Sequence, residues 1–164
     1  MSIRIIVTGG TFDKRYDEIE GTLTFHETHL PDILRQVRVT IPIEVETNQL
    51  IDSLHMTPQD RLRILEACRQ APESQLIVTH GTDTIVETAR LLGEANLPKT
   101  IVLTGAMIPY TVFGSDSLFN LGSSVAAVQM LPQGVYISMN GRVFDWDNVQ
   151  KDRSKGIFET LGSD

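Results

Sequence analysis

The amino-acid sequence predicts an α/β domain of the flavodoxin-like, three-layer type, with a mostly parallel sheet of five strands. Five short apolar runs rich in β-branched residues alternate along the chain with segments whose apolar residues recur at helical spacing. The chain has 164 residues, the size of one domain, and shows no internal repeat, low-complexity segment or linker. We therefore expect residues 1–164 to form a single domain.

Composition excludes several classes of partner. The chain has 14 basic and 21 acidic residues, a net charge of −7, with no block of like charge. This balance argues against nucleic acid or an anionic membrane surface as a partner. The single cysteine, Cys68, excludes a disulfide framework and fits a reducing compartment. No apolar run approaches the ~20 residues of a membrane span, and the N-terminal run is too short for a signal peptide. We expect a cytoplasmic protein.

The first half of the chain is expected to contribute two strands to the sheet. Residues 3–7 form a short apolar strand closed by two glycines, and residues 41–45 form the next one. Between them, residues 11–21 are polar and irregular, a long loop of the kind that often has a functional role. Residues 22–25 add a small strand, and Pro31 marks the start of the first helix.

The second helix has a strong start signal. Thr57-Pro58-Gln59-Asp60 is typical of an N-terminal cap with proline in the first turn. Three-residue spacing in the helix that follows directs one face toward the core. That face comprises Leu62, Leu65 and Cys68, with Ile64 and Ala67 widening it.

The second half of the chain continues the alternation of strands and helices. Strands are predicted at residues 75–79, 100–103 and 135–139, and helices at 83–95 and from Ser115 or Asp116 to about 131. Thr82 or Asp83 is expected to cap the first of these helices. Asn140-Gly141 is a turn signal, so residues 142–146 should fold back as a hairpin. The last stretch, 148–164, is polar, with Ile157-Phe158 as its apolar anchor.

This order of elements places two turns side by side. In the flavodoxin-like strand order 2-1-3-4-5, strands one and three are neighbours, and ligands bind at their carboxyl ends. Strand one ends in Thr8-Gly9-Gly10-Thr11, and strand three ends at residues 79–83. The sequence therefore predicts a site between these two turns, both of which carry hydroxyl groups.

The residues of these turns allow nucleophilic chemistry. Thr11 follows two glycines, which permit a tight turn and leave backbone N–H groups close to a ligand. A threonine hydroxyl becomes a nucleophile only when a neighbouring base takes its proton. Thr82, Asp83 and a lysine can form such a relay, because a neutral lysine amine is a base. Lys151 is the best candidate, since it follows the fifth strand at the same edge of the sheet.

Plainer interpretations apply to the same motifs. A Gly-Gly-Thr sequence after a strand is often only a turn, and a threonine before a helix is more often a cap than a catalyst. The first turn lacks the spacing of phosphate-binding loops. His26 and His29 have a metal-like spacing but no cysteine near them, which favours a solvated loop. His80 is expected to form hydrogen bonds behind the site rather than to bind a ligand.

Two motifs resemble the signature sequences of the bacterial-type L-asparaginase/glutaminase family. They are Thr8-Gly9-Gly10-Thr11 and His80-Gly81-Thr82-Asp83-Thr84. Residues 104–121 resemble the family's GAM…FNL stretch, and residues 135–151 resemble its strand, Asn-Gly turn and following lysine. The resemblance covers essentially the whole chain and keeps the family's order.

The resemblance implies a chemical role for each matching position. Thr11 matches the threonine that attacks the side-chain amide carbon and becomes the acyl-enzyme. Thr82, Asp83 and Lys151 match the residues of the proton relay. The family also has a tyrosine near the nucleophile, usually farther along its loop than Tyr16, which is the candidate in this chain.

The same resemblance implies how a substrate is held. Asp83 matches a ligand of the α-amino group, and Ser53, which follows Asp52, matches the serine that binds the α-carboxylate. The implied substrate-binding positions are Gly10, Asp52, Ser53, Gly81, Thr82, Asp83 and Ala106. No metal ion or cofactor is implied.

Typical members of this family have a second, C-terminal domain, which supplies an acidic residue to a neighbouring subunit. This sequence ends at Asp164, where that domain would begin, so it resembles a short form made of the N-terminal domain alone. A homodimer or larger homo-oligomer is therefore expected to complete the pocket.

The expected function is that of an L-asparagine amidohydrolase that releases ammonia and then L-aspartate. L-Glutamine, which is one methylene longer, is not distinguished from L-asparagine at this level. An asparaginase-fold module that binds an amino acid or amide without turnover is the main alternative. A flavodoxin-like flavin binder ranks last, because few aromatic residues lie near the loops to stack on a flavin.

Overall fold

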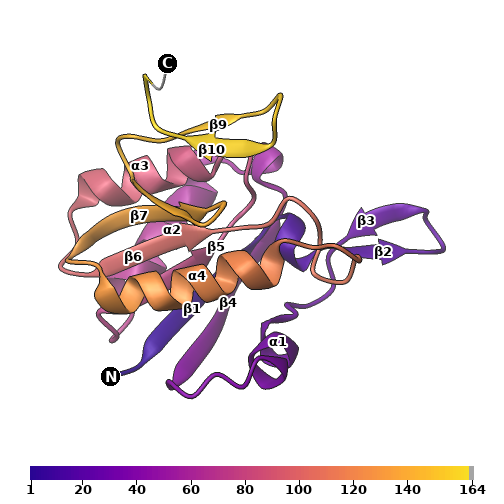
Figure 1. Ribbon diagram of the computed structural model, residues 1–164, viewed down its shortest axis with the longest axis horizontal. Helices are drawn as coiled ribbons and strands as arrows, with labels where there is room; N and C mark the ends of the chain where they lie inside the picture. Colours follow the sequence, from indigo (N-terminus) through magenta and orange to yellow (C-terminus); the bar gives the residue numbers. More distant parts are fainter. Residues whose placement is uncertain (163–164) are drawn as a thin grey trace.

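The computed structural model describes residues 1–162 and contains alternating strands and helices (Figure 1). The strands are β1 (Ile3–Gly9), β2 (Arg15–Asp17), β3 (Thr22–Thr24), β4 (Ile43–Ile51), β5 (Gln75–Thr79), β6 (Thr100–Thr104), β7 (Gly134–Met139), β8 (Arg142–Asp145), β9 (Gln150–Asp152) and β10 (Ile157–Glu159). The helices are α1 (Leu30–Gln36), α2 (Pro58–Gln70), α3 (Ile85–Ala95) and α4 (Ser117–Met130), with short 3-10 helices η1 (Thr11–Asp13) and η2 (Ser53–His55).

The main sheet has the strand order β4-β1-β5-β6-β7-β8. The first five of these strands are parallel and follow the predicted order 2-1-3-4-5. The predicted number of five strands is one too few, because the hairpin expected at 142–146 pairs with β7 as an antiparallel edge strand, β8. The flavodoxin-like fold class is confirmed, and the carboxyl ends of β1 and β5 are adjacent.

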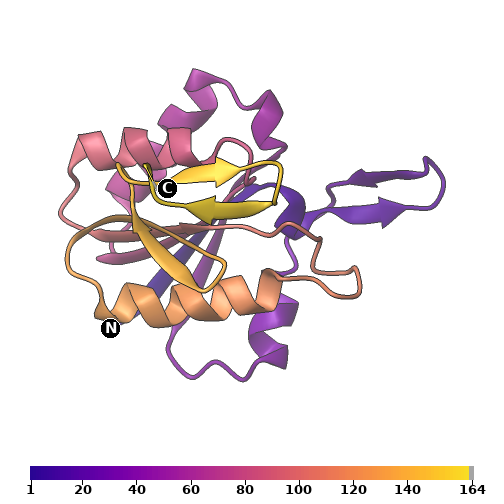
Figure 2. The same cartoon turned by 45° about the horizontal axis from the view of Figure 1, so that its top comes forward.

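Helices cover both faces of this sheet and give the three predicted layers (Figure 2). One apolar core lies between the sheet and α2 and α3, and it includes Ile64 and Leu92. The second core lies between the sheet and α1 and α4, and it includes Ile33 and Leu121. Within residues 1–162, none of the helices has both the length and the hydrophobicity of a membrane span.

The start of α2 is as predicted, and its buried face differs from the prediction at one residue. Thr57 accepts a hydrogen bond from the backbone N–H of Asp60, whose carboxylate accepts one from the N–H of Thr57, which is a complete capping box. The prediction that Leu62 faces the core is wrong, since its exposed fraction is 46%. Leu65 and Cys68 are buried as predicted, and Ile64, which was expected only to widen this face, is fully buried.

The predicted cap of α3 is also wrong. Thr84, rather than Thr82 or Asp83, occupies the N-cap position, and no side chain caps this helix. Thr84 instead donates its hydroxyl to the backbone oxygen of Ser53 at 2.9 Å. The physical consequence is that Thr82 and Asp83 lie before the helix on the turn, where their side chains are available for other contacts.

Two antiparallel hairpins extend the sheet edge that carries the predicted site. β2 and β3 form one of them, within a segment predicted to be largely irregular. This hairpin projects from the body of the domain at the right of Figure 1. β9 and β10 form the other, and it is anchored by buried Phe158, whose N–H donates to Oδ1 of Asn140 at 2.8 Å. Ile157, the other residue of the predicted anchor, is 37% exposed.

Candidate active site

The turns that follow β1 and β5 touch each other. A Cβ atom at Gly10 would lie 2.4 Å from the backbone nitrogen of Gly81 and 2.5 Å from its Cα atom. Only glycine allows this approach, and Gly10 also has a φ of +81°, which favours glycine. Thr11 is the next residue. The structure therefore places Gly10, the residue before Thr11, against the turn that carries Thr82 and Asp83, as the strand order predicts.

The short helix η1 fixes the backbone of Thr11. Asp13, two residues further on, is fully buried. Its Oδ1 atom accepts hydrogen bonds from the hydroxyl of Thr28 at 3.0 Å and from the N–H of His29 at 2.9 Å. Burial raises the pKa of Asp13 above its usual value. No sequence pattern singles out Asp13, because only the fold brings residues 28–29 to it.

Lys151 joins Thr82 and Asp83, as predicted. Its Nζ atom donates hydrogen bonds to Oγ1 of Thr82 at 2.8 Å and to Oδ1 of Asp83 at 2.9 Å. The side chain of Lys151 is largely buried on β9, opposite Phe158. Lys151 thus bridges a hydroxyl and a carboxylate by hydrogen bonds. This is the arrangement that proton transfer requires.

Arg153 is a second cation at Asp83, and the sequence analysis missed it. Its NH1 group donates to Oδ1 of Asp83 at 2.8 Å, and its NH2 group donates to the backbone oxygen of Asp83 at 2.9 Å. Arg153 lies on the turn that follows β9, so the pairing of β9 with β10, and no local sequence pattern, brings it to Asp83.

Ser53 and Asp52 enter the site from β4, which is longer than predicted and runs to Ile51. A Cβ atom at Gly81 would lie 2.5 Å from Oγ of Ser53, so these residues are in direct contact. Oγ of Ser53 also accepts a hydrogen bond from the N–H of Thr84 at 3.3 Å. Lys14, another residue that the sequence analysis missed, donates to Oδ2 of Asp52 at 2.5 Å and lowers the pKa of this carboxyl.

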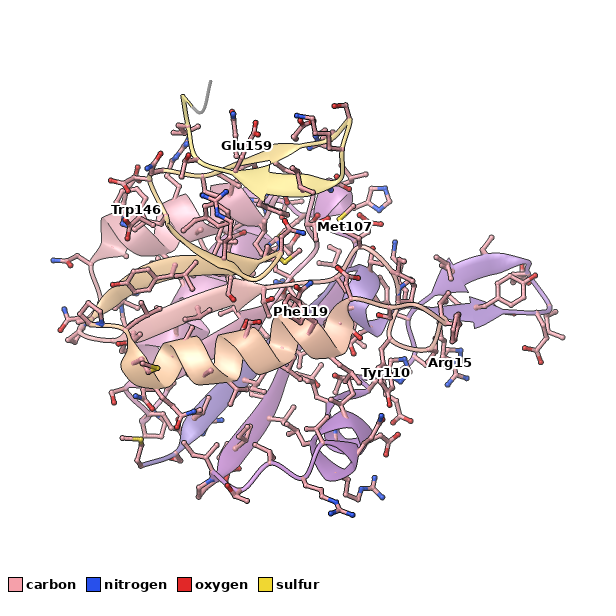
Figure 3. All side chains as sticks on the ribbon, in the orientation of Figure 1. Arg15, Met107, Tyr110, Phe119, Trp146 and Glu159 are labelled. Atoms are coloured by element: carbon pink, nitrogen blue, oxygen red, sulfur yellow. The ribbon has the colours of Figure 1, made fainter. Side chains whose placement is uncertain are left out.

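The turn after β6 closes the site on the side away from β4. A Cβ atom at Gly105 would lie 2.4 Å from the backbone oxygen of His80, and the next residue, Ala106, is buried. The Thr82 hydroxyl lies 3.6 Å from Sδ of Met107. Met107, labelled in Figure 3, also packs beneath the turn between β9 and β10, where a Cβ at Gly156 would be 3.4 Å from its methyl carbon.

His80 supports the turn from behind. It is fully buried, its Nδ1 lies 2.7 Å from the backbone oxygen of Gly81, and its Nε2 lies 2.7 Å from Oγ1 of Thr88. A carbonyl oxygen can only accept, so Nδ1 carries the proton and Nε2 accepts from Thr88. Burial lowers the pKa of His80 to about 4. The neutral ring therefore acts as a structural hydrogen-bonding group at neutral pH.

Tyr16 is the sequence-predicted site residue that lies away from this cluster. It is 60% exposed and sits on the β2–β3 hairpin, paired with Leu23. Arg15, labelled in Figure 3, begins this hairpin, which projects from the body of the domain. The hairpin would have to fold toward Thr11 for Tyr16 to reach it.

Among residues 1–162, no three His, Cys, Asp or Glu side chains are grouped so that they could hold a metal ion. His29, one of the two histidines with metal-like spacing, has its ring 5.6 Å from that of Tyr110 instead.

The site therefore defines a class of protein: an α/β domain with a threonine-bearing turn beside a Thr–Lys–Asp cluster. A family model described as "Asparaginase, N-terminal" matches residues 2–160, and the chain belongs to this family. It is 28% identical to "L-asparaginase 1" of Escherichia coli (strain K12) over 166 residues, an alignment that covers 95% of this chain and 49% of that protein.

Solved structures agree with this assignment. The thermostable L-asparaginase from Thermococcus kodakarensis superposes with a TM-score of 0.86 at 28% identity, covering all of this chain and 52% of that one. A probable cytoplasmic L-asparaginase from Campylobacter jejuni superposes with a TM-score of 0.83 at 29% identity, covering 98% of this chain and 53% of that one. The chain thus spans about half the length of the relatives that it matches.

Proposed function

We propose that this chain hydrolyses the side-chain amide of L-asparagine and releases ammonia and L-aspartate. The observation that carries the proposal is the hydrogen-bonded cluster of Lys151, Thr82 and Asp83 on a turn that touches the turn of Thr11. Family membership supports the same class of reaction.

Thr11 is the proposed nucleophile. Its Oγ1 atom attacks the amide carbon, and the hydroxyl proton passes along the relay of Thr82 and Lys151 to the carboxylate of Asp83. The C–N bond then breaks, the proton returns to the leaving nitrogen, and ammonia departs. Water attacks the resulting ester of Thr11 by the same route in reverse. This step restores the threonine and releases aspartate.

The remaining residues are proposed to hold the substrate. Asp83 is positioned to accept a hydrogen bond from an ammonium group at the site. The α-carboxylate binds at Ser53, beside the Asp52–Lys14 ion pair, whose lysine offers a cation. Further pocket positions, where backbone and a small side chain allow close approach, are Gly10, Gly81, Thr82 and Ala106.

We also propose an assisting tyrosine, an oligomeric state and a competing substrate. Tyr16 assists Thr11 once the β2–β3 hairpin closes over the bound substrate. The protein functions as a homodimer or larger homo-oligomer. L-Glutamine is a competing substrate, since one methylene is worth only about 1–3 kcal/mol of discrimination.

A binding module without turnover is the second candidate, and the position of Tyr16 favours it. The open hairpin leaves this tyrosine 60% exposed, so Thr11 lacks its aid in this conformation. In this case the chain would hold an amino acid or amide through Asp83 and Ser53 but would not cleave it.

Ammonia release from L-asparagine and L-glutamine, measured for the wild type and for Thr11→Ala, separates these candidates. We expect turnover by the wild type, with asparagine preferred, and a loss on the order of a thousandfold or more in a Thr11→Ala variant with an unchanged circular dichroism spectrum. A folded wild type that releases no ammonia, yet melts at a higher temperature with aspartate, would instead support the binding module.

A further inference from the structure

Asp83 is a single carboxylate held between two cations. Lys151 approaches Oδ1 of Asp83 at 2.9 Å, and Arg153 approaches the same oxygen at 2.8 Å. Arg153 makes a second contact to the backbone oxygen of Asp83, so its guanidinium is fixed at two points. The negative charge of Asp83 is therefore largely compensated before any ligand arrives.

Two further carboxylates at this edge of the sheet, Asp52 and Asp116, are also engaged. Asp52 is paired with Lys14 at 2.5 Å. Asp116 accepts hydrogen bonds from the backbone N–H groups of Met107 and Ile108, all at 3.0 Å. The charge of each of these three carboxylates is therefore partly compensated before a positively charged group on a ligand arrives.

Arg153 also has N–H donors that could bind an anion. The guanidinium has five N–H donors in a planar fork, and its contacts to Asp83 use one from each terminal nitrogen. Its side chain is 60% exposed, so the remaining donors are open to solvent. A planar fork of this kind binds carboxylates well.

We propose that Arg153 sets the charge class of the substrate, by weakening the contribution of a substrate ammonium group and favouring amides that carry only a carboxylate. The inference rests on the proposed amidohydrolase function. It implies that the site distinguishes weakly between L-asparagine, a zwitterion, and succinamate, the same amide without the α-amino group. Arg153 is a specificity-determining residue in this account, and the reacting groups remain those named above.

The test compares kcat/KM for L-asparagine and for succinamate in the wild type, Arg153→Gln and Arg153→Lys. In Arg153→Gln, Asp83 loses one of its two cationic partners and therefore attracts an ammonium group more strongly. We expect the ratio of asparagine to succinamate to rise about fivefold, the size of one partly exposed ion pair. Arg153→Lys keeps the charge and should shift the ratio by less. Lys155→Gln is the matched control, because it removes a charge from the same turn while Lys155 pairs with Asp152 rather than with Asp83.

Equal loss of activity toward both substrates in Arg153→Gln, with the ratio unchanged, would overturn the proposal and leave Arg153 a purely structural role. A ratio that shifts equally in Lys155→Gln would overturn it as well. Absence of ammonia from both substrates would contradict the proposed function but not this inference. The rise in melting temperature with aspartate and with succinate then decides, since Arg153→Gln should favour aspartate relative to succinate, and an unchanged preference would overturn the proposal.

Discussion

Gly10→Ala tests the contact between the two turns. The new methyl carbon would lie 2.4 Å from the backbone nitrogen of Gly81, 2.5 Å from its Cα and 2.8 Å from the carbonyl carbon of His80. All three neighbours are backbone atoms, so no side chain can rotate away. The turns must separate by about 1 Å to reach ordinary van der Waals distance.

Two effects of this substitution lower the free energy of unfolding. Gly10 has φ 81° and ψ 179°, a region that is essentially restricted to glycine and costs about 1–3 kcal/mol for other residues. Forcing one extra carbon into a packed contact costs roughly another 1–3 kcal/mol. We therefore expect the free energy of unfolding to fall by about 2–6 kcal/mol. A displacement of about 1 Å at the site should lower kcat/KM roughly a hundredfold.

Urea unfolding and ammonia release measure these two effects, and Gly114→Ala is the control. Gly114 also has a φ of +81°, but a Cβ atom there would meet nothing within 4 Å. It should lose about 1–2 kcal/mol of stability for the backbone alone and keep its activity. If Gly10→Ala were as stable and as active as Gly114→Ala, the two turns would not be in contact as described.

Two further predictions concern Lys151 and His80. Lys151→Met removes the group that joins Thr82 and Asp83, and it should lower kcat by about 10²–10⁴ with little change in melting temperature. The control variant Lys155→Met should keep full activity. Equal kcat in the two variants would contradict the relay. For His80, an NMR titration should show a neutral ring down to about pH 5, because burial lowers its pKa to about 4 from an ordinary value of 6.5. As the pH falls, the unfolded chain therefore binds this proton before the folded chain does. The neutral state of His80 contributes about 3 kcal/mol to the free energy of unfolding above pH 6.5, and this contribution is lost as the pH falls toward 4. A titration midpoint near 6.5 would refute the buried neutral state.

Much of the fold follows from local patterns in the sequence. Strong periodicity and short connections predict the five parallel strands, and the strand order then predicts that Gly10 and Gly81 meet. Lys151 was predicted at the same edge because it follows the last parallel strand. These predictions depend on topology, which is robust to errors of a few residues in each element.

The misses have local physical causes. Leu62 and Ile64 lie on opposite faces of α2, and only packing against the sheet selects the face that carries Ile64. Thr84 takes the N-cap because Ser53, distant in the sequence, binds its hydroxyl and its N–H. Arg153 lies on a turn whose path depends on the β9–β10 pairing. Long-range contacts of this kind leave no signal in a local pattern.

Trapping the covalent intermediate tests the central claim most directly. The wild type is mixed with L-asparagine, quenched in acid within one turnover and digested, and the peptides are analysed by mass spectrometry. The account predicts an aspartyl ester on Thr11, which is absent from Thr11→Val under the same conditions. An ester on Thr82 instead, or continued ammonia release by Thr11→Val at the wild-type rate, would contradict Thr11 as the nucleophile.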